Sequence, residues 1–305
     1  MMEGNASGAY GPQASPLGVS SAAAGALFLG YSAPMPGSDS RYSDGTVAHE
    51  TRLLGVPALS AAVSGPVGRP VGETVLEAVL GSRSVAGGYA DFRTAGYLAP
   101  LARAALLGER SSKVLAGLSH ADARSFARAL EAAGPEHLRG TLYGAINVAL
   151  GAGRDATLRD AMRFAAAGSP GDSMAREYAR DFEVTRDLAR PALMGALARA
   201  EATRPAFVQA YLEVLDEVPD PDVASRAGRK EAEEVSRMAH GVLKAGGVYS
   251  RRGLQAINNL DGLLRSDARL KPSATEAPVV AAAFLLALEY GPGYLGGRVR
   301  LAPHR

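Results

Sequence analysis

Apolar residues recur at three- and four-residue spacing along most of the chain, and a Gly or Pro closes almost every such segment. This spacing places the apolar side chains on one face of an α-helix, whose end the Gly or Pro marks. The segments expected to be helical are 16–33, 46–63, 72–80, 94–108, 119–134, 157–168, 204–219, 221–247, 251–267 and 274–292. The sequence lacks the alternating β-branched runs that indicate strands. It therefore predicts an all-α fold, as a single compact multi-helix domain with no significant sheet.

Capping residues bound two of these segments. Ser119 is placed to cap the helix over 119–134, Asp122 stands three residues later as in a capping box, and Gly134 ends the helix. For the first helix, Ser20 or Ser21 is the expected N-cap, because serine accepts a hydrogen bond from the free N–H groups of the first turn. Ser119 and Ser20 or Ser21 are therefore the predicted N-caps of these two helices.

Two prolines fall inside predicted helices. Pro57 lies within 46–63 and Pro100 within 94–108. Proline has no backbone N–H and its ring crowds the preceding turn, so it kinks or breaks a helix. We expect an interruption at Pro57 and a kink or restart at Pro100.

Composition adds the domain boundaries and narrows the function classes. The 305 residues are 47% hydrophobic and 21% charged, enough for one large core or two closely apposed ones. We predict a domain over 17–292, a disordered tail over 1–16 and a C-terminal tail over 293–305. The net charge of +2 is too balanced to indicate nucleic-acid or anionic-membrane binding. Without cysteine the chain suits a reducing compartment, and the ten-residue apolar run 279–288 predicts a buried helix rather than a membrane span, so cytoplasmic location is expected.

Several catalytic motifs are excluded by their spacing. The run "GAGRDA" at 151–156 lacks the third glycine of a dinucleotide loop and follows a predicted helix, and the sequence has no Walker A run. The histidines show no HExxH spacing that would indicate zinc, and "GDSMA" is not a GxSxG elbow. Any ATP would therefore bind without a P-loop.

The charged segment "GDSMAREYARDFEVTRD", residues 171–187, otherwise has the pattern of a helix. On a helix, Asp172, Arg176 and Arg180 share one face, and Glu177 lies one turn before Asp181. One hypothesis is a solvated face with ion pairs of about 0.3–0.5 kcal/mol each. The other is a cluster of carboxylates and arginines that binds Mg²⁺ and phosphates. Spacing leaves both open.

The order of these segments resembles a known family. The run "TLRDAMRFAAAGSPGDSMAREYARDFEV" is similar to the Ala/Met-rich helix and D-x-(I/M)-A-R motif of the triphosphoribosyl-dephospho-CoA synthases, the CitG-like transferases. The runs "VLAGLSHADARSFARAL" and "FVQAYLEVLDEVPDPDVASRAGRKEAEEV" are similar to its flanking helices. The resemblance extends from about residue 22 to 290 and is nearest to the branch encoded near tetrahydromethanopterin cofactor genes.

The resemblance implies an all-helical enzyme that moves the triphosphoribosyl unit of ATP to the 2′-hydroxyl of 3′-dephospho-CoA and releases adenine. It implies Mg²⁺ with ATP as substrate, and catalytic or metal-binding roles for Asp172 and Glu177. The residues implied to contact phosphates or nucleotide are Arg41, Arg93, Arg176, Lys271 and Thr275. Those implied to bind the metal are Asp39, Asp91 and Asp172. We expect one cleft walled by 34–41, 87–94, the helix from Asp172 and 271–276.

Three loops depart from the family pattern. The family's P-K-P-G-N-V becomes "PMPGSD", with Met35 in place of Lys, and its N-T-N-L-G aligns with residues 89–93, where both amide side chains are gone. In its N-P-G-T-(T/S)-A-D-L, Lys271 replaces Asn and Ala277 replaces Asp. Three hypotheses about the function therefore stay open. The first two are catalytic: triphosphoribosyl transfer, or a related transfer in pterin- or furan-type cofactor synthesis. In the third, the protein keeps the same helical scaffold but acts as a non-enzymatic partner in a cofactor-synthesis complex.

Overall fold

A computed structural model describes most of the chain. The residues it describes are 13–42, 47–134, 137, 140–153, 155–168 and 171–296. Within them lie fifteen α-helices and no strand, which confirms the all-α prediction. Residues 1–12 of the predicted N-terminal tail, Thr46 and residues 297–305 lie outside this part of the chain.

The helices of the first half run as follows. They are α1 Pro16–Ser32, α2 His49–Val63, α3 Val71–Val85, α4 Phe92–Leu107, α5 Ser111–Ala116, α6 His120–Ala133, α7 Thr141–Gly151, α8 Leu158–Ala166 and α9 Ser173–Ala179. The second half holds α10 Arg190–Arg199, α11 Thr203–Glu217, α12 Pro221–Arg226, α13 Arg229–Lys244, α14 Arg251–Ser266 and α15 Glu276–Tyr290. A π-helix, η2 Val184–Ala189, leads into α10, and short 3₁₀ segments include η5 Pro292–Gly296.

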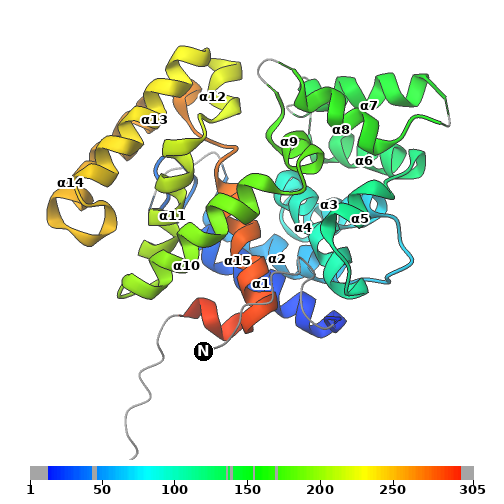
Figure 1. Ribbon diagram of the computed structural model, residues 1–305, viewed down its shortest axis with the longest axis horizontal. Helices are drawn as coiled ribbons and strands as arrows, with labels where there is room; N and C mark the ends of the chain where they lie inside the picture. Colours follow the sequence, from blue (N-terminus) through cyan, green and yellow to red (C-terminus); the bar gives the residue numbers. More distant parts are fainter. Residues whose placement is uncertain are drawn as a thin grey trace, which may run out of the picture.

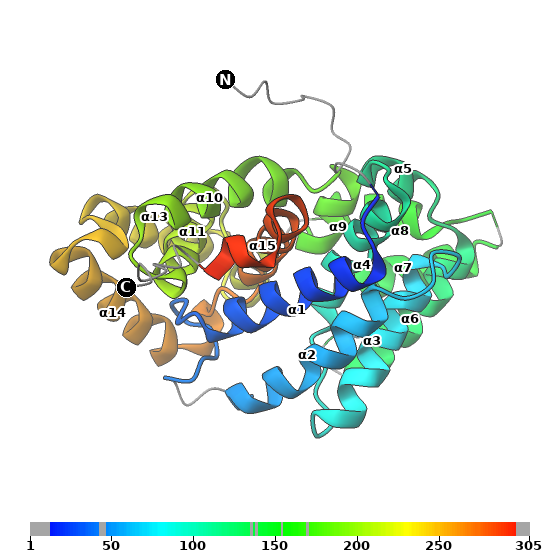
Figure 2. The same ribbon diagram turned by 90° about the horizontal axis from the view of Figure 1, so that it is seen from below.

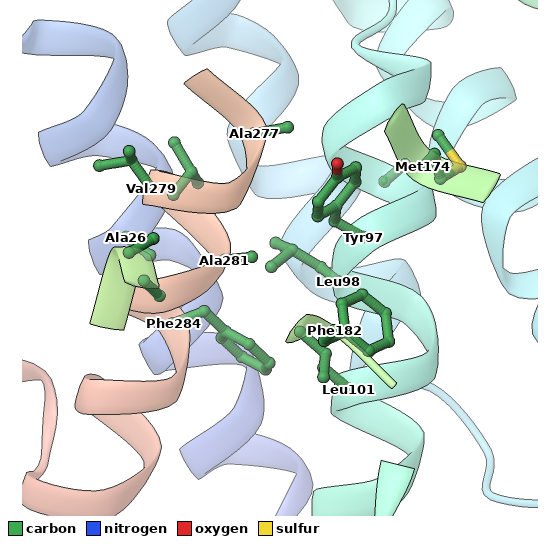
Figure 3. Packing of buried hydrophobic residues seen from close by; sticks show 14 of the residues in the cluster. Ala26, Tyr97, Leu98, Leu101, Met174, Phe182, Ala277, Val279, Ala281 and Phe284 are labelled. Carbon is green, nitrogen blue, oxygen red and sulfur yellow. The ribbon is translucent and has the colours of Figure 1, made fainter. Parts of the chain in front are cut away.

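The centre of the molecule is built around α15. Figure 1 shows α1 and α15 between two groups of helices, with α11–α14 on one side and α3–α9 on the other. Figure 2 shows α1 running alongside α2, beside the same central helix. In Figure 3, Ala281 and Phe284 of α15 face Leu98 and Leu101 of α4. The run 279–288 is buried almost throughout, as its sequence predicted, because small and branched side chains let helices approach from all sides.

No helix in the described part of the chain is both long and apolar enough to cross a bilayer.

The first N-cap differs from the prediction. Ser15, not Ser20 or Ser21, caps α1, with its Oγ accepting the N–H of Gly18 at 3.0 Å. Pro16 at the first helical position explains why the cap is Ser15, because the fixed φ of proline suits the first turn of a helix and proline has no N–H to satisfy.

Both internal prolines are also accommodated. The α-helix continues through Pro57 in α2 and through Pro100 in α4, so the predicted interruption at Pro57 is wrong. Nearly all of α4 is buried, and packing of this kind holds a helix together despite one missing hydrogen bond.

The capping box of α6 is present and extends to another helix. Asp122 accepts the N–H and the Oγ–H of Ser119 at 2.8 and 2.6 Å, and its other oxygen accepts the N–H of Gly72 in α3 at 2.9 Å. Thr157 and Asp160 form a similar box at the start of α8, but at the surface. Asp122 therefore joins two helices, whereas Asp160 serves one.

We expect Asp122→Ala to lower the free energy of unfolding by about 3 kcal/mol, from a lost cap and a buried N–H of Gly72 left without an acceptor. Asp160→Ala, the matched control, should cost only about 1 kcal/mol. Chemical denaturation of both variants measures the difference. Equal losses would show that the Gly72 contact contributes nothing.

Candidate functional site

The charged segment from Asp172 is not one helix. Asp172 caps α9, accepting the N–H of Ala175 at 2.9 Å, but α9 ends at Ala179. Asp181 and Phe182 then take positive φ values of 54° and 60°, before the π-helix η2 begins. The predicted continuous helix through 187 is wrong, because left-handed residues interrupt the α-helical ladder.

Contacts on both sides stabilise this strained turn. Asp181 accepts hydrogen bonds from Ser111 Oγ at 2.5 Å and Arg186 Nη1 at 2.7 Å. The ring of Phe182 is fully buried, and its centre lies 6.1 Å from that of the Tyr97 ring (Figure 3). It also lies 5.8 Å from the centre of the Tyr178 ring. Left-handed non-glycine residues cost about 1–3 kcal/mol each. Burial of the Phe182 ring and the hydrogen bonds of Asp181 to Ser111 and Arg186 offset that cost.

The turn brings two backbone N–H groups to Glu177. Its carboxyl oxygens accept from Val184 N at 3.0 Å and Thr185 N at 3.3 Å, and the residue is only 2% exposed. Burial raises the pKa of Glu177 to about 7, although hydrogen bonds from Thr185 and Val184 and the charge of Arg176 act against that rise. Glu177 can therefore hold or release a proton near neutral pH.

The raised pKa makes stability depend on pH. Since the folded state holds the proton more tightly than the unfolded chain, whose glutamate pKa is near 4.5, stability should fall as pH rises from about 4.5 to 7. The loss attributable to Glu177 is expected to reach about 3 kcal/mol. Chemical denaturation at a series of pH values gives the free energy of unfolding of the wild type and of Glu177→Gln. The difference between the two free energies should change by that amount over this pH range. A difference that does not change with pH would contradict the raised pKa of Glu177.

Glu177 lines a cavity of about 460 Å³. The cavity lies between α9 on one side and the end of α11, α12, the start of α13 and residues 274–278 on the other. Its polar lining consists of Asp172, Ser173, Arg176, Glu177, Arg180, Arg229, Glu233 and Thr275, with the hydroxyl of Tyr97 nearby. Its apolar lining includes Val184, Val214, Val218, Pro219, Pro221 and Pro278. This volume is typical of a small-molecule site.

The arginines that line the cavity form only exposed ion pairs within the described part of the protein. Glu183 lies 3.7 Å from Arg176 and 3.1 Å from Arg180, and Arg229 pairs with Glu233 at 2.8 Å. All three arginine side chains are more than 40% exposed, so these pairs contribute little stability. They are free to exchange a carboxylate for an anionic ligand.

Asp172 lies at the inner side of this wall. Burial raises the pKa of Asp172, and the positive charge of Arg93 and the N–H of Ala175 oppose the rise. Asp172 and Glu177 thus give the cavity two carboxyl groups that both accept backbone N–H groups, with the charge of Arg93 acting on the first and that of Arg176 on the second.

Asp220 was not identified from the sequence, yet it holds the far wall of the cavity. It is fully buried and accepts the N–H groups of Asp222, Val223 and Ala274 at 2.9, 3.1 and 2.9 Å. It also accepts both the N–H and the hydroxyl of Thr275, at 3.0 and 2.8 Å. The signal was present, since Asp directly before Pro221 is a helix-cap pattern.

The structure brings together only some of the predicted site residues. Asp172, Arg176, Glu177 and Thr275 line the cavity. The prediction that loops 34–41 and 87–94 wall the same cleft is wrong, since none of their residues lines it. Arg41 is exposed and lies outside it.

The remaining predicted residues are paired with other groups of the chain. Lys271 donates to Asp39 at 2.7 Å, and Arg93 binds Asp222 at 2.7 Å and the carbonyl of Ser273 at 2.6 Å. These two cations are engaged by carboxylates of the protein itself.

The predicted Mg²⁺ ligands do not form a resident metal site. Asp39, Asp91 and Asp172 do not cluster, and in the described residues no group of three or more His, Cys, Asp or Glu could hold a metal. Asp91 accepts from Tyr31 Oη and Thr94 Oγ1, both at 2.7 Å, and from Thr94 N at 2.9 Å. Both oxygens of Asp91 thus accept hydrogen bonds within the protein, and Oδ1 of Asp39 accepts one from Lys271.

Comparison with known proteins bears on this geometry. The family model described as CitG, ATP:dephospho-CoA triphosphoribosyl transferase, matches residues 19–293. The chain belongs to the CitG family. This is a family of transferases, and the match covers every residue that lines the cavity. No curated protein matches the CitG-family chain.

Among solved structures, a candidate triphosphoribosyl-dephospho-CoA synthase from Archaeoglobus fulgidus matches with a TM-score of 0.56 and 20% identity. The match covers 80% of this chain and 99% of the other. At that identity the likeness shows a shared fold. The roles of individual residues remain predictions.

Proposed function

We propose that this CitG-family protein transfers the triphosphoribosyl group of ATP, supplied as Mg·ATP, to the 2′-hydroxyl of 3′-dephospho-CoA or of a related phosphorylated acceptor. The observation that supports it is the cavity beside α9, whose lining includes the carboxyl groups of Asp172 and Glu177 and three arginines. Membership of the family supports the same reaction class.

The reaction breaks the C1′–N9 bond of ATP and forms a bond from C1′ to the acceptor oxygen. Glu177, with a pKa of about 7, is suited to donate a proton to the departing adenine. Asp172 is suited to stabilise positive charge at C1′ and to take the proton of the acceptor hydroxyl. The proton taken from the hydroxyl replaces, through solvent, the one given to adenine.

The arginines would bind the triphosphate. Arg176, Arg180 and Arg229 each supply a planar set of donors for phosphate oxygens. The Nε of Arg176 is buried and has no hydrogen-bond partner among the described residues, which leaves a donor for a ligand. The apolar wall of Val214, Val218 and the prolines can cover the less polar part of a substrate.

Adenine release from Mg·ATP in the presence of dephospho-CoA, followed by chromatography, tests the proposal. Equal amounts of adenine and a triphosphoribosylated product are expected. In calorimetry, Arg176→Gln should weaken Mg·ATP binding about tenfold through loss of a charged phosphate contact. Arg237→Gln, which alters an exposed arginine outside the cavity, is the control. No adenine from any phosphorylated acceptor would refute the transfer.

A second candidate is a non-catalytic partner in a complex that makes a pterin- or furan-type cofactor. The pairing of Lys271 with Asp39 and of Arg93 with Asp222 favours it, because cations predicted to meet phosphates are already neutralised. Under this alternative the protein would release no adenine and Mg·ATP would not change its melting temperature.

A further inference from the structure

Away from the large cavity, the guanidinium of Arg52 lies among aromatic groups and partly buried acidic groups. Arg52 of α2 is 6% exposed and forms an ion pair with Glu276 at the start of α15. Its Nη2 is also 3.9 Å from Asp91 Oδ2, and its Nη1 donates to the carbonyl of Asp39 at 3.0 Å. The guanidinium carbon lies 3.9 Å from the centre of the Tyr31 ring.

We infer that Arg52 is a built-in cation that occupies, between the carboxylates of Asp91 and Glu276, the place a divalent metal ion would take. The guanidinium, which is itself buried, supplies positive charge to two carboxylates that are only 15% exposed. The polypeptide therefore carries its own counter-ion here, and this part of the fold does not use a resident Mg²⁺.

The contacts of Asp91 and Arg52 fit a guanidinium better than a metal ion. Asp91 accepts from the hydroxyls of Tyr31 and Thr94, whereas a metal ligand must offer its oxygens to the ion. A ring face against the guanidinium is a cation–π contact, which suits arginine.

The space beside Arg52 is also too small for a hydrated metal. The adjoining cavity, lined by groups that include Arg52, Tyr89 and Asp91, has a volume of about 10 Å³. Such a space holds at most about one water molecule. Mg²⁺ requires octahedral coordination and usually keeps several waters.

This inference is independent of the reaction proposed for the large cavity. Arg52, Asp91 and Glu276 do not line that cavity, and Mg²⁺ that arrives bound to ATP would not need them. The role of the Arg52 guanidinium can therefore be tested without substrate.

Arg52→Ala provides the test, with melting temperature as the readout. The variant should melt well below the wild type, and millimolar methylguanidinium should recover much of the loss by entering the vacated position. Methylguanidinium should not raise the melting temperature of the wild type. It should not raise that of Arg190→Ala either, which removes a partly exposed pair with Glu289. Failure of methylguanidinium to rescue Arg52→Ala selectively would overturn the inference.

Manganese binding gives a second measurement that does not depend on the variant folding. Electron paramagnetic resonance of the substrate-free wild type with added Mn²⁺ should detect no saturable binding site that depends on Asp91. A site of that kind would be present in the wild type and absent in Asp91→Asn. Such a site, if found, would overturn the inference even if adenine release proceeds as proposed. Conversely, a protein that releases no adenine could still satisfy both tests of Arg52.

Discussion

Replacing Asp220 by alanine should lower the free energy of unfolding by about 3–5 kcal/mol, a large part of the stability of a typical domain. Its carboxylate accepts five hydrogen bonds, four from backbone N–H groups and one from the Thr275 hydroxyl, and it is fully buried. Burial and the charge of Asp222 raise the pKa of Asp220 to about 6, which still leaves it mostly ionised at neutral pH. Its removal leaves those donors buried and without an acceptor. Chemical denaturation at neutral pH measures the loss.

Two further variants test whether Asp220 contributes more stability through its five hydrogen bonds than an aspartate that only caps a helix at the surface. Asp220→Asn should be nearly as damaging, because an amide presents N–H donors to backbone N–H groups. Asp267→Ala removes an aspartate that caps the short 3₁₀ segment Ala268–Leu270 at the surface and should have a much smaller effect. Asp220 joins the start of α12 to residues 274–275, and both segments belong to the cavity wall. Asp220→Ala should therefore also weaken Mg·ATP binding. A loss no larger than that of Asp267→Ala would show that the five contacts do not act together.

The fold was largely predictable because its signals are local. Spacing of apolar residues and the cap at Ser119 depend on neighbours within a few turns, and the structure has helices where those signals lie. The N-cap of α1 was assigned to Ser20 or Ser21 because these serines carry the same chemistry as Ser15. The passage of α2 through Pro57 was missed because it depends on tertiary packing, which no local pattern records.

Of the predicted residues, those near Asp172, where the family motif is best preserved, and Thr275 line the cavity. The break after Ala179 depends on Phe182 finding a buried place beside Tyr97, a contact between distant segments. Pairing of Lys271 with Asp39 joins residues 232 positions apart. A sequence shows that each of these residues is charged, but it does not show that one neutralises the other.

Glu177→Gln should reduce adenine release by roughly 10²–10⁴-fold, the usual effect of removing a general acid. The amide keeps one oxygen to accept the N–H of Val184, so the variant should fold, and its melting temperature checks this. With a pKa of about 7, the wild type should lose activity as pH rises above neutrality, because the proton needed by adenine is then gone. In Glu177→Gln that decline should disappear along with most of the rate.

Glu183→Gln is the matched control for this prediction. It lies six residues further along, is partly exposed and contacts Arg176 and Arg180 without sharing the backbone donors of Glu177. Exposed pairs of this kind contribute little, so adenine release should change by less than about threefold and keep the wild-type pH profile. If Glu177→Gln also kept both rate and profile, Glu177 would serve only to cap η2, and the proton for adenine would have to come from another group or from solvent.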